Sequence, residues 1–582
     1  MIEYCITLIQ IKYSMTVAVC NYQTVIFFLP FFDGIHKQGL QKDVTIGHRI
    51  NSYLHLGDVE IMCPFQIHNH KKAAAAAVAA VLCMASFGVF AATEHWNDAS
   101  LTPQVTTRTA VSDDTDWQQW KANWDSIKTN YEQVSIAPGA DATQLNFGWY
   151  SKDNADKAEV RIADNQDMKR AKTFKGTNTA GTVISGTQYY SNKVTAKGLK
   201  AEKTYWYQVK VDGAWQAAQP VKTGNPDDFT FMYVGDPQIG ASAGQTPAEG
   251  NAKQTGEIAA RNDAYNWNKT LNEALSQHPE INFLVSPGDQ INEPAEDQSP
   301  DKIQLQEYQY AGYLSAAALR SLPEASSIGN HDCLTSGYQN HFNVPNAFTE
   351  ETNPTKAGHG YYYTYGNALF IVINANNYNA ADHKALIEKA IKAHPDTKWR
   401  IVVMHQDIYG SGLDHSDSDG ILLRTQLTPI YDANKIDVVL QGHDHTYART
   451  YQLSSDGKQH ADFADMKVKG QTGQTHSLLN KALKNSDFKS NYESQNLCYT
   501  IADMQQGVLH NPKGVFYMSS NSATGSKFYN LIPQKQDYVA ARSQLWRPTY
   551  SVVHITKDTF TINTYDAETG TPIDDSYSIV KD

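Results

Sequence analysis

The sequence predicts an N-terminal all-β sandwich followed by a larger, layered α/β domain. Three observations lead to this fold class. Short alternating strands broken by turn residues fill roughly residues 134–222, strands alternate with helical segments from Phe229 onward, and strands return in about the last 80 residues. We place the sandwich at 134–225 and the α/β domain at 226–582.

The first domain is predicted from the alternation of its strand-like runs. These runs are Gln144–Tyr150, Ala158–Ile162, Tyr189–Thr195 and Thr204–Val211. Successive side chains of a strand point to opposite faces, so strict alternation separated by regular turn signals is typical of an antiparallel sandwich. The last run resembles the later strands of a fibronectin type III-like module, and Gly224–Asp228 is the expected linker.

In the second domain, helical periodicity precedes apolar strands. The helical segments Asp263–His278 and Asp382–His394 are followed by the strand-like runs Ile281–Val285 and Trp399–Met404. This alternation is typical of α/β domains that bind ligands at the ends of their strands. The closing strands are expected at Gly514–Met518, Tyr550–Ile555 and Thr559–Thr564.

Two regions are expected to shape the mouth of a site in the second domain. One is the polar stretch 453–513, which is expected to be an insertion. The other lies between Glu293 and Ser321 and contains Tyr308, Tyr310 and Tyr313. Neither region predicts a pocket for a particular ligand.

The N-terminal stretch carries the pattern of a secretory signal peptide. Residues 62–92 combine a basic start, an Ala-rich apolar run and a small-residue exit. Because such peptides begin a protein, we expect residues 1–61 to come from an over-extended reading frame and 93–133 to lead into the first domain. An uncleaved anchor and a lipoprotein cut before Cys83 are the alternatives. The expected location is secreted, periplasmic or at the cell surface.

Composition is ordinary for a soluble globular protein and argues against a dedicated nucleic-acid binder. The 582 residues carry a net charge of −12 and are 41% hydrophobic, so no overall positive charge would attract nucleic acid or anionic lipid. Beyond the expected leader only Cys333 and Cys498 remain, which could form one disulfide or stay as two buried thiols. No apolar run of the expected mature chain is long enough to span a bilayer.

Five short segments end in residue types that bind metals. Each follows an apolar, strand-like run and places Asp, Asn or His just past it, usually beside a Gly. The segments are V-G-D-P-Q at 234–238, S-P-G-D-Q at 286–290, I-G-N-H-D at 328–332, V-V-M-H at 402–405 and Q-G-H-D-H at 441–445. Strands that end at one edge of a sheet bring such residues together. A mixture of oxygen and imidazole ligands suits two ions of the Zn, Mn or Fe type.

In this order the five segments resemble the calcineurin-like metallophosphoesterases. The preceding β module, the long spacing and the run V-V-L-Q-G-H-D-H-T-Y-A-R-T at 438–450 are most similar to the purple acid phosphatase branch. The resemblance covers roughly residues 134–582. It implies a layered α/β/β/α sandwich, a centre of two divalent or trivalent Fe, Zn or Mn ions, and a small phosphate ester as the substrate.

Side-chain chemistry and the resemblance together assign a role to each candidate ligand. Asp289 would bridge both ions, because a carboxylate can hold one metal on each oxygen. His443 and His445 are two residues apart, so on extended backbone both side chains project to the same side and could reach adjacent ions. The other expected ligands are Asp236 and His445 on the first ion and Asn330, His405 and His443 on the second.

Two further histidines are expected to contact the substrate. His331 would bind phosphoryl oxygens or protonate the leaving alcohol. His415 follows the His405 motif in a loop where the family places a substrate-contacting His, and a solvated loop histidine is the alternative. Asp332 and Asp444 are expected to accept hydrogen bonds from the metal-bound imidazoles.

The sequence departs from the family pattern at two positions. Purple acid phosphatases have G-D-x-x-Y at the second motif, and its Tyr binds Fe(III). Asn292 stands at that position here, so the resemblance does not support a purple iron–tyrosinate centre. The wider superfamily has D-x-H at the first motif, and Gln238 replaces the His. We expect the Gln238 amide oxygen to fill the vacant ligand position, with a hydrogen bond to a ligand as the alternative.

The expected activity is hydrolysis of phosphate monoesters by a metal-activated hydroxide, as in an acid phosphatase. A nucleotide phosphodiesterase or nucleotidase is the enzymatic alternative. A non-catalytic surface binding protein with a degenerate site is a third hypothesis, which the replacements at positions 238 and 292 keep open.

Overall fold

The computed structural model describes residues 115–247, 252–413, 415–416, 419–460, 496–534 and 536–582, together with the backbone of four strands near the N-terminus. Those strands form two antiparallel hairpins, β1 (Ile6–Ile11) with β2 (Met15–Cys20) and β3 (Ile50–Leu56) with β4 (Val59–Phe65). The chain divides into two compact units, Met1–Phe90 and Ala91–Asp582. Most of the expected leader at 62–92 and much of the 453–513 insertion lie outside the described residues.

The β-sandwich consists of two antiparallel sheets, as the alternating pattern predicts. Their strand orders are β5-β6-β10-β9 and β12-β11-β7-β8, with β13 also paired to β11. The first sheet contains β5 (Ser135–Pro138), β6 (Gln144–Ser151), β9 (Thr177–Ile184) and β10 (Thr187–Lys197). The second contains β7 (Glu159–Ala163), β8 (Lys172–Lys175), β11 (Thr204–Val211), β12 (Ala214–Trp215) and β13 (Gln219–Lys222). Phe147, Trp149, Val160 and Val209 belong to the core between them.

The α/β domain is built on two seven-stranded mixed sheets, with strand orders β16-β15-β14-β27-β28-β29-β24 and β17-β18-β19-β20-β25-β21-β26. The first contains β14 (Asp228–Tyr233), β15 (Ile281–Ser286), β16 (Glu324–Ser326), β24 (Val508–His510), β27 (Thr549–Thr556), β28 (Thr559–Asp566) and β29 (Tyr577–Val580). The second contains β17 (Tyr361–Tyr365), β18 (Ala368–Val372), β19 (Trp399–Val403), β20 (Val438–Gln441), β21 (Tyr447–Thr450), β25 (Phe516–Ser519) and β26 (Val539–Ser543). The strands β22 (Gln452–Ser455) and β23 (Tyr499–Asp503) form a separate two-stranded antiparallel sheet.

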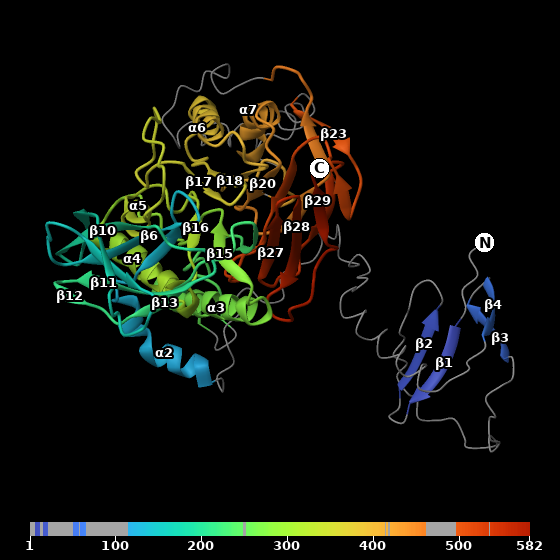
Figure 1. The fold of residues 1–582 in the computed structure, drawn as a ribbon, viewed down its shortest axis with the longest axis horizontal. Coiled ribbons are helices and arrows are strands. Elements are labelled where there is room, and N and C mark those ends of the chain that lie inside the picture. Colours follow the sequence, from blue (N-terminus) through green and yellow to red (C-terminus); the bar gives the residue numbers. More distant parts are fainter. Residues whose placement is uncertain are drawn as a thin grey trace. The chain divides into compact units, whose positions relative to one another are not determined.

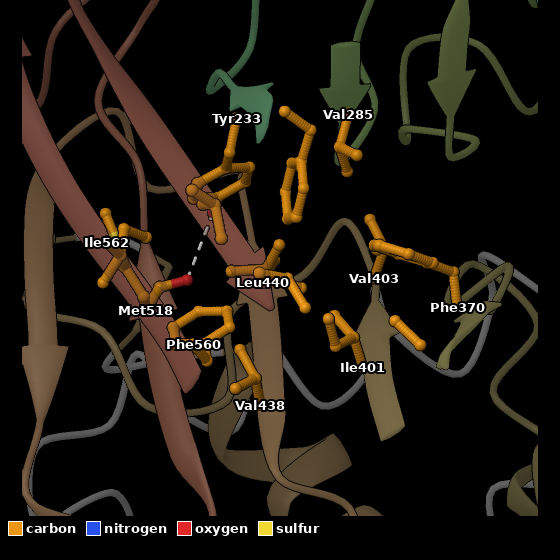
Figure 2. Packing of buried hydrophobic residues seen from close by; sticks show 14 of the residues in the cluster. Tyr233, Val285, Phe370, Ile401, Val403, Val438, Leu440, Met518, Phe560 and Ile562 are labelled. Carbon is orange, nitrogen blue, oxygen red and sulfur yellow. Dashed lines mark hydrogen bonds between the residues drawn. The ribbon is translucent and has the colours of Figure 1, made fainter. Parts of the chain in front are cut away.

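Apolar side chains from both large sheets meet in one core. Figure 2 shows Tyr233 and Val285 of the first sheet facing Leu440, Val403 and Phe370 of the second. The Tyr233 hydroxyl, which is buried in this core, donates a hydrogen bond to a backbone carbonyl of the opposite sheet at 3.2 Å, so its polar end is satisfied.

Helices cover the outer face of each large sheet. In Figure 1, α3 (Gly256–Gln277) and α4 (Pro300–Leu314) lie on one side of the domain and α6 (Ala380–Ala393) and α7 (Asp419–Ala433) on the other. Each pair packs its apolar residues on its own sheet. The four layers are therefore α/β/β/α, which confirms the predicted fold class.

Helix α2 (Thr115–Lys128) comes from the segment that was expected only to lead into the first domain. Its Trp117 and Trp124 are buried, and Trp124 belongs to the same core as α3 and α4. Lys128 forms an ion pair with Glu257 in the first turn of α3. The segment therefore extends the helical layer of the α/β domain.

The sandwich packs on the α/β domain around a buried hydrogen-bonded pair of side chains. His341 ends the short helix α5 (Gly337–His341), and its Nε2 lies 2.8 Å from Glu307 Oε2 of α4. Both side chains are at most 1% exposed. Tyr150 of β6 places its ring 4.4 Å from that of His341 and donates its hydroxyl to Glu307 at 3.3 Å. Strands β5 and β6 are buried on both faces, unlike β9 and β10 of the same sheet.

Some local expectations are corrected by the structure. Tyr310 and Tyr313 are fully buried, because α4 turns them toward the core, so they do not shape the mouth of the site. Cys333 and Cys498 are both free thiols, which excludes the disulfide that the sequence left open. In the part of the chain that the structure describes, no helix is both long enough and apolar enough to cross a bilayer.

Candidate metal centre

All five metal-type segments lie at the same edge of the two large sheets. They follow β14, β15, β16, β19 and β20, and each of these strands runs parallel to a neighbour among them. The pairing continues past the strands, because Gln238 N donates to Asp289 O at 2.8 Å and Gly442 N donates to His405 O at 2.9 Å. The carboxyl ends of parallel strands thus place these loops side by side.

One group of donors surrounds Asp236. His445 Nε2 lies 3.1 Å from Asp236 Oδ2, and the backbone N–H of His443 donates to both carboxylate oxygens at 3.0 and 2.9 Å. Asp236 and His445 are at most 1% exposed. The first and last motifs of the chain therefore share one buried carboxylate.

A second group surrounds Asp289. His405 Nε2 lies 3.4 Å from Asp289 Oδ1 and 2.8 Å from Asn330 Oδ1. Ligand atoms of Asp289, His405 and His443 all lie within 4.8 Å of one another, a spacing that could hold a metal ion. Neighbouring ligands of an ion with bonds of roughly 2.0–2.2 Å have similar separations, so this donor set fits a transition metal.

Gln238 lies beside Asp289 of the second group, and its amide oxygen makes no hydrogen bond with the described residues. Its Nε2 donates to Asp289 Oδ2 at 3.4 Å, whereas its buried Oε1 has no hydrogen-bond partner among the described residues. A buried carbonyl oxygen without a partner costs about 1–3 kcal/mol. A cation at this position would satisfy that oxygen, which is consistent with a ligand role for Gln238.

The backbone of the site is strained and crowded. Gln238, Asp289, His443 and His445 all have positive φ, between 38° and 69°, a conformation that costs non-glycine residues about 1–3 kcal/mol each. A Cβ on Gly329 would lie 2.0 Å from Asp289 Oδ1, and other glycines of the motifs are similarly crowded. Glycine is needed at these positions because another segment of the same chain approaches too closely to leave room for a side chain.

Charge pairing within the site holds its carboxylates ionised. Burial favours the neutral form of Asp289, but the imidazoles of His405 and His331 outweigh it and hold the pKa of this carboxyl well below its usual range. Burial also opposes the charge of His405, but Asp289 and Asp236 raise its pKa to about 9. Without metal, protonated imidazole therefore occupies the position that a cation would take.

His331 and His415 approach the centre from two sides. His331 Nδ1 lies 2.5 Å from the carbonyl of Asn292, and its Nε2 lies 4.0 Å from Asp289 Oδ2. Because a carbonyl only accepts, Nδ1 carries the proton and Nε2 faces the site. The His415 ring lies 3.7 Å from the His443 ring, and its Nε2 is 3.0 Å from the Tyr529 hydroxyl. The structure therefore brings all nine candidate residues together.

Two of the metal-type histidines do not use the expected carboxylate partners. His405 Nδ1 has no hydrogen-bond partner among the described residues, and His445 Nδ1 bonds the Lys527 carbonyl. Asp332 accepts from the backbone N–H groups of Gly329 and Gln290 at 3.0 and 3.3 Å, and Asp444 accepts from those of Ser411 and Ser416 at 3.1 and 3.3 Å. Both carboxylates therefore stabilise loops.

A loop that the sequence analysis did not single out completes the site. Residues 520–529, named here the β25 loop, follow strand β25. The Lys527 carbonyl is 2.8 Å from His445 Nδ1 and fixes that ring, and Tyr529 bonds His415 as described above. The only sequence signal was a run of small hydroxyl residues, S-S-N-S-A-T-G-S at 519–526, which carries no recognised motif.

Comparison with known proteins agrees with this architecture. Residues 131–223 match the family described as purple acid phosphatase, N-terminal domain, and residues 229–447 match calcineurin-like phosphoesterase. A purple acid phosphatase of Glycine max is 22% identical over 347 residues, which are 56% of this chain and 66% of that protein. An uncharacterized Mycobacterium tuberculosis protein is 24% identical over 144 residues, 22% of this chain and 26% of that protein.

Among solved structures, a purple acid phosphatase from seeds of yellow lupin, Lupinus luteus, has a TM-score of 0.51 at 13% identity. The match covers 78% of this chain and 74% of that one, and supports the fold. Fold and site together define a metallophosphoesterase architecture. The chain therefore carries a purple acid phosphatase N-terminal domain followed by a calcineurin-like phosphoesterase domain.

One prediction concerns Gln238, which stands where the wider superfamily has His. Gln238→Leu is expected to weaken binding of the first ion at least tenfold, because leucine is similar in size to glutamine but lacks the oxygen that would bind the ion. Gln238→His should retain or restore affinity, since imidazole is also a ligand. Metal titration followed by calorimetry measures both. Equal affinity in the wild type and Gln238→Leu would exclude a ligand role.

Proposed function

We propose that this protein is a secreted phosphoester hydrolase with a dinuclear metal centre, acting on phosphate monoesters in the manner of an acid phosphatase. The observation that carries the proposal is the convergence of two buried carboxylates, an unpartnered amide oxygen and three imidazoles at one sheet edge. Such mixed oxygen and nitrogen donors suit Zn, Mn or Fe ions. Asp289 lies beside both Gln238 and His405, which are assigned to different ions, and would bridge the two.

Each residue has a defined task in this proposal. Asp236, Gln238 and His445 would hold the first ion. Asn330, His405 and His443 would hold the second, and Asp289 would join them. Bound ions would neutralise phosphoryl charge and supply hydroxide at neutral pH. Side chains of the protein would position the ester and donate a proton to the leaving oxygen.

His331 is suited to that proton transfer. Its Nδ1–H is fixed on the Asn292 carbonyl, so donation of a proton to the leaving oxygen requires the imidazolium form, in which Nε2 also carries a proton. The ring is partly exposed, with 23% of its side chain accessible, whereas His405 is fully buried. His331 can therefore contact a substrate, and it is not needed as a metal ligand.

Replacing His331 separates catalysis from metal binding. His331→Ala is expected to lower kcat about 10²–10⁴-fold, the usual contribution of a general acid, while metal content stays near that of the wild type. His510→Ala, at an exposed histidine of β24, is the matched control. Steady-state kinetics with elemental analysis measure both quantities. Full activity of His331→Ala would contradict the assigned role.

The proposed activity is tested on purified protein. Elemental analysis should find two transition-metal ions per chain, and chelation should abolish hydrolysis of p-nitrophenyl phosphate. A preparation that binds fewer than two ions and cleaves no ester would overturn the proposal. It would also favour the non-catalytic binding protein that the replacements at 238 and 292 keep open.

Nucleotide phosphodiesterase or nucleotidase activity is the second candidate. The support for it is that His331 and His415 are both partly exposed, so the substrate side of the site is open to solvent. Parallel assays with p-nitrophenyl phosphate, bis-p-nitrophenyl phosphate and nucleoside monophosphates separate the candidates.

Secretion forms part of the proposal and has its own test. The pattern at 62–92 favours export from a start at Met62, followed by removal of the leader. The natural N-terminus is expected near residue 92, which mass spectrometry of the purified protein would measure. Peptides from 1–61 would contradict the proposed start.

A further inference from the structure

The β25 loop is built onto the first metal motif. Ser522 Oγ donates to the Asp236 carbonyl at 3.2 Å, and Thr524 Oγ1 donates to the Pro237 carbonyl at 2.8 Å. Ser526 Oγ donates to the Gln238 carbonyl at 3.4 Å. These bonds tie the loop, residue by residue, to the segment that carries two candidate ligands. The position of its tip is therefore coupled to the geometry of the centre.

Lys527 lies near the end of this loop, and its backbone carbonyl and its side-chain ammonium make different contacts. Its carbonyl accepts from His445 Nδ1 at 2.8 Å, which fixes the backbone beside a candidate ligand. Its ammonium lies 4.7 Å from the centroid of the Tyr529 ring, a distance typical of a cation–π contact. The ammonium is thus held near the centre without lying among the metal ligands.

The aromatic ring that holds Lys527 also contacts two histidines of the site. The Tyr529 ring lies 5.3 Å from the His445 ring and 4.8 Å from the His415 ring. The Tyr529 hydroxyl is also 3.0 Å from His415 Nε2. The Lys527 ammonium is therefore held against a ring that touches both a candidate ligand and a histidine expected to contact the substrate.

We propose that Lys527 binds the non-bridging oxygens of the substrate phosphoryl group and makes the site selective for dianionic monoesters over monoanionic diesters. This inference rests on the proposed function. A monoester of pKa about 6 carries nearly two negative charges at neutral pH, whereas a diester carries one. A fixed ammonium beside the phosphoryl site therefore stabilises the monoester more strongly.

The test compares Lys527→Gln and Lys527→Arg with the wild type, all loaded with metal. Lys197→Gln, at an exposed lysine of the sandwich, is the matched control. The measurements are kcat/KM for p-nitrophenyl phosphate and bis-p-nitrophenyl phosphate, the Kd for orthophosphate by calorimetry, and metal content. Lys527→Gln is expected to lose about 10–100-fold in monoester kcat/KM and in orthophosphate affinity, the usual effect of one charge-assisted hydrogen bond. Diester kcat/KM should change less than about threefold, and Lys527→Arg should retain most of the selectivity.

Each outcome distinguishes this inference from the proposed function. An unchanged monoester-to-diester ratio with unchanged orthophosphate affinity would overturn the role of Lys527, even if the wild type is an active phosphatase. Loss of metal from Lys527→Gln would overturn it too, because the side chain would then act through His445. If the wild type cleaves neither ester but Lys527→Gln still binds orthophosphate more weakly, the proposed activity fails and the anion site stands.

Discussion

Asp289→Asn is expected to remove bound metal and phosphatase activity together. The substitution keeps the shape of the side chain and the acceptor for the His331 N–H, which lies 2.9 Å from Asp289 Oδ1. It removes the charge that would be shared by two cations. Metal ions contribute several kcal/mol to such reactions, so kcat/KM should fall at least about 10³-fold. Elemental analysis and p-nitrophenyl phosphate hydrolysis measure the two losses on one sample.

An exposed carboxylate of the same domain provides the control. Asp227 lies on the surface at the start of the α/β domain, and Asp227→Asn should change neither quantity. If Asp289→Asn retains two ions per chain, Asp289 does not bridge them. If it loses metal but keeps activity, the hydrolysis does not depend on this centre.

Gly329→Ala is expected to damage the site by steric conflict alone. The added Cβ would lie 2.0 Å from Asp289 Oδ1 and 2.1 Å from the Asp289 backbone nitrogen. A backbone atom cannot move aside cheaply, so the two loops must separate. Overpacking of this kind costs about 1–3 kcal/mol. Thermal unfolding should therefore shift to lower temperature, and metal affinity should fall because Asn330 moves with the loop.

Gly198→Ala separates this clash from a general effect of losing a glycine. A Cβ on Gly198 meets no atom within 4 Å, although its φ of +77° is unfavourable for alanine. That variant should lose only a modest amount of stability and keep its metal affinity. A Gly329→Ala protein with wild-type metal affinity would show that the contact between the two loops is adjustable.

The layered fold could be predicted because each element carried its own signal. The apolar runs before four of the metal-type segments are the strands β14, β15, β19 and β20, which are largely buried on both faces, and alternation predicts the sandwich. The third segment follows the short strand β16, which reads Glu-Ala-Ser. Helix α4 was missed because its buried face contains Tyr310, Tyr313 and Gln306, which do not stand out as an apolar stripe. Helix α2 carries Trp117, Trp120 and Trp124 at helical spacing, so its amphipathic pattern is visible in the sequence, but nothing in that pattern shows that it packs on the α/β domain.

Candidate ligands were accessible from sequence, but their supporting contacts were not. Asp332 and Asp444 lie next to histidines in the chain, yet they accept hydrogen bonds from backbone N–H groups, both within their own loop and in other loops. The carbonyl that orients His445 belongs to Lys527, which is 82 residues away. A backbone carbonyl is present at every residue, so no pattern of side chains can reveal which one a histidine will contact.

The buried contact between Tyr150 and the Glu307–His341 pair has a consequence for the evolution of this architecture. A sandwich that covers a buried polar pair cannot be exchanged freely for another accessory module. Deleting residues 134–225 would expose two polar side chains that now share one buried contact at 2.8 Å. Helix α4 also carries Tyr310, whose hydroxyl bonds Asp332 at 3.2 Å, so such a truncation would reach the loop of Asn330. The two domains are therefore expected to be inherited as one unit.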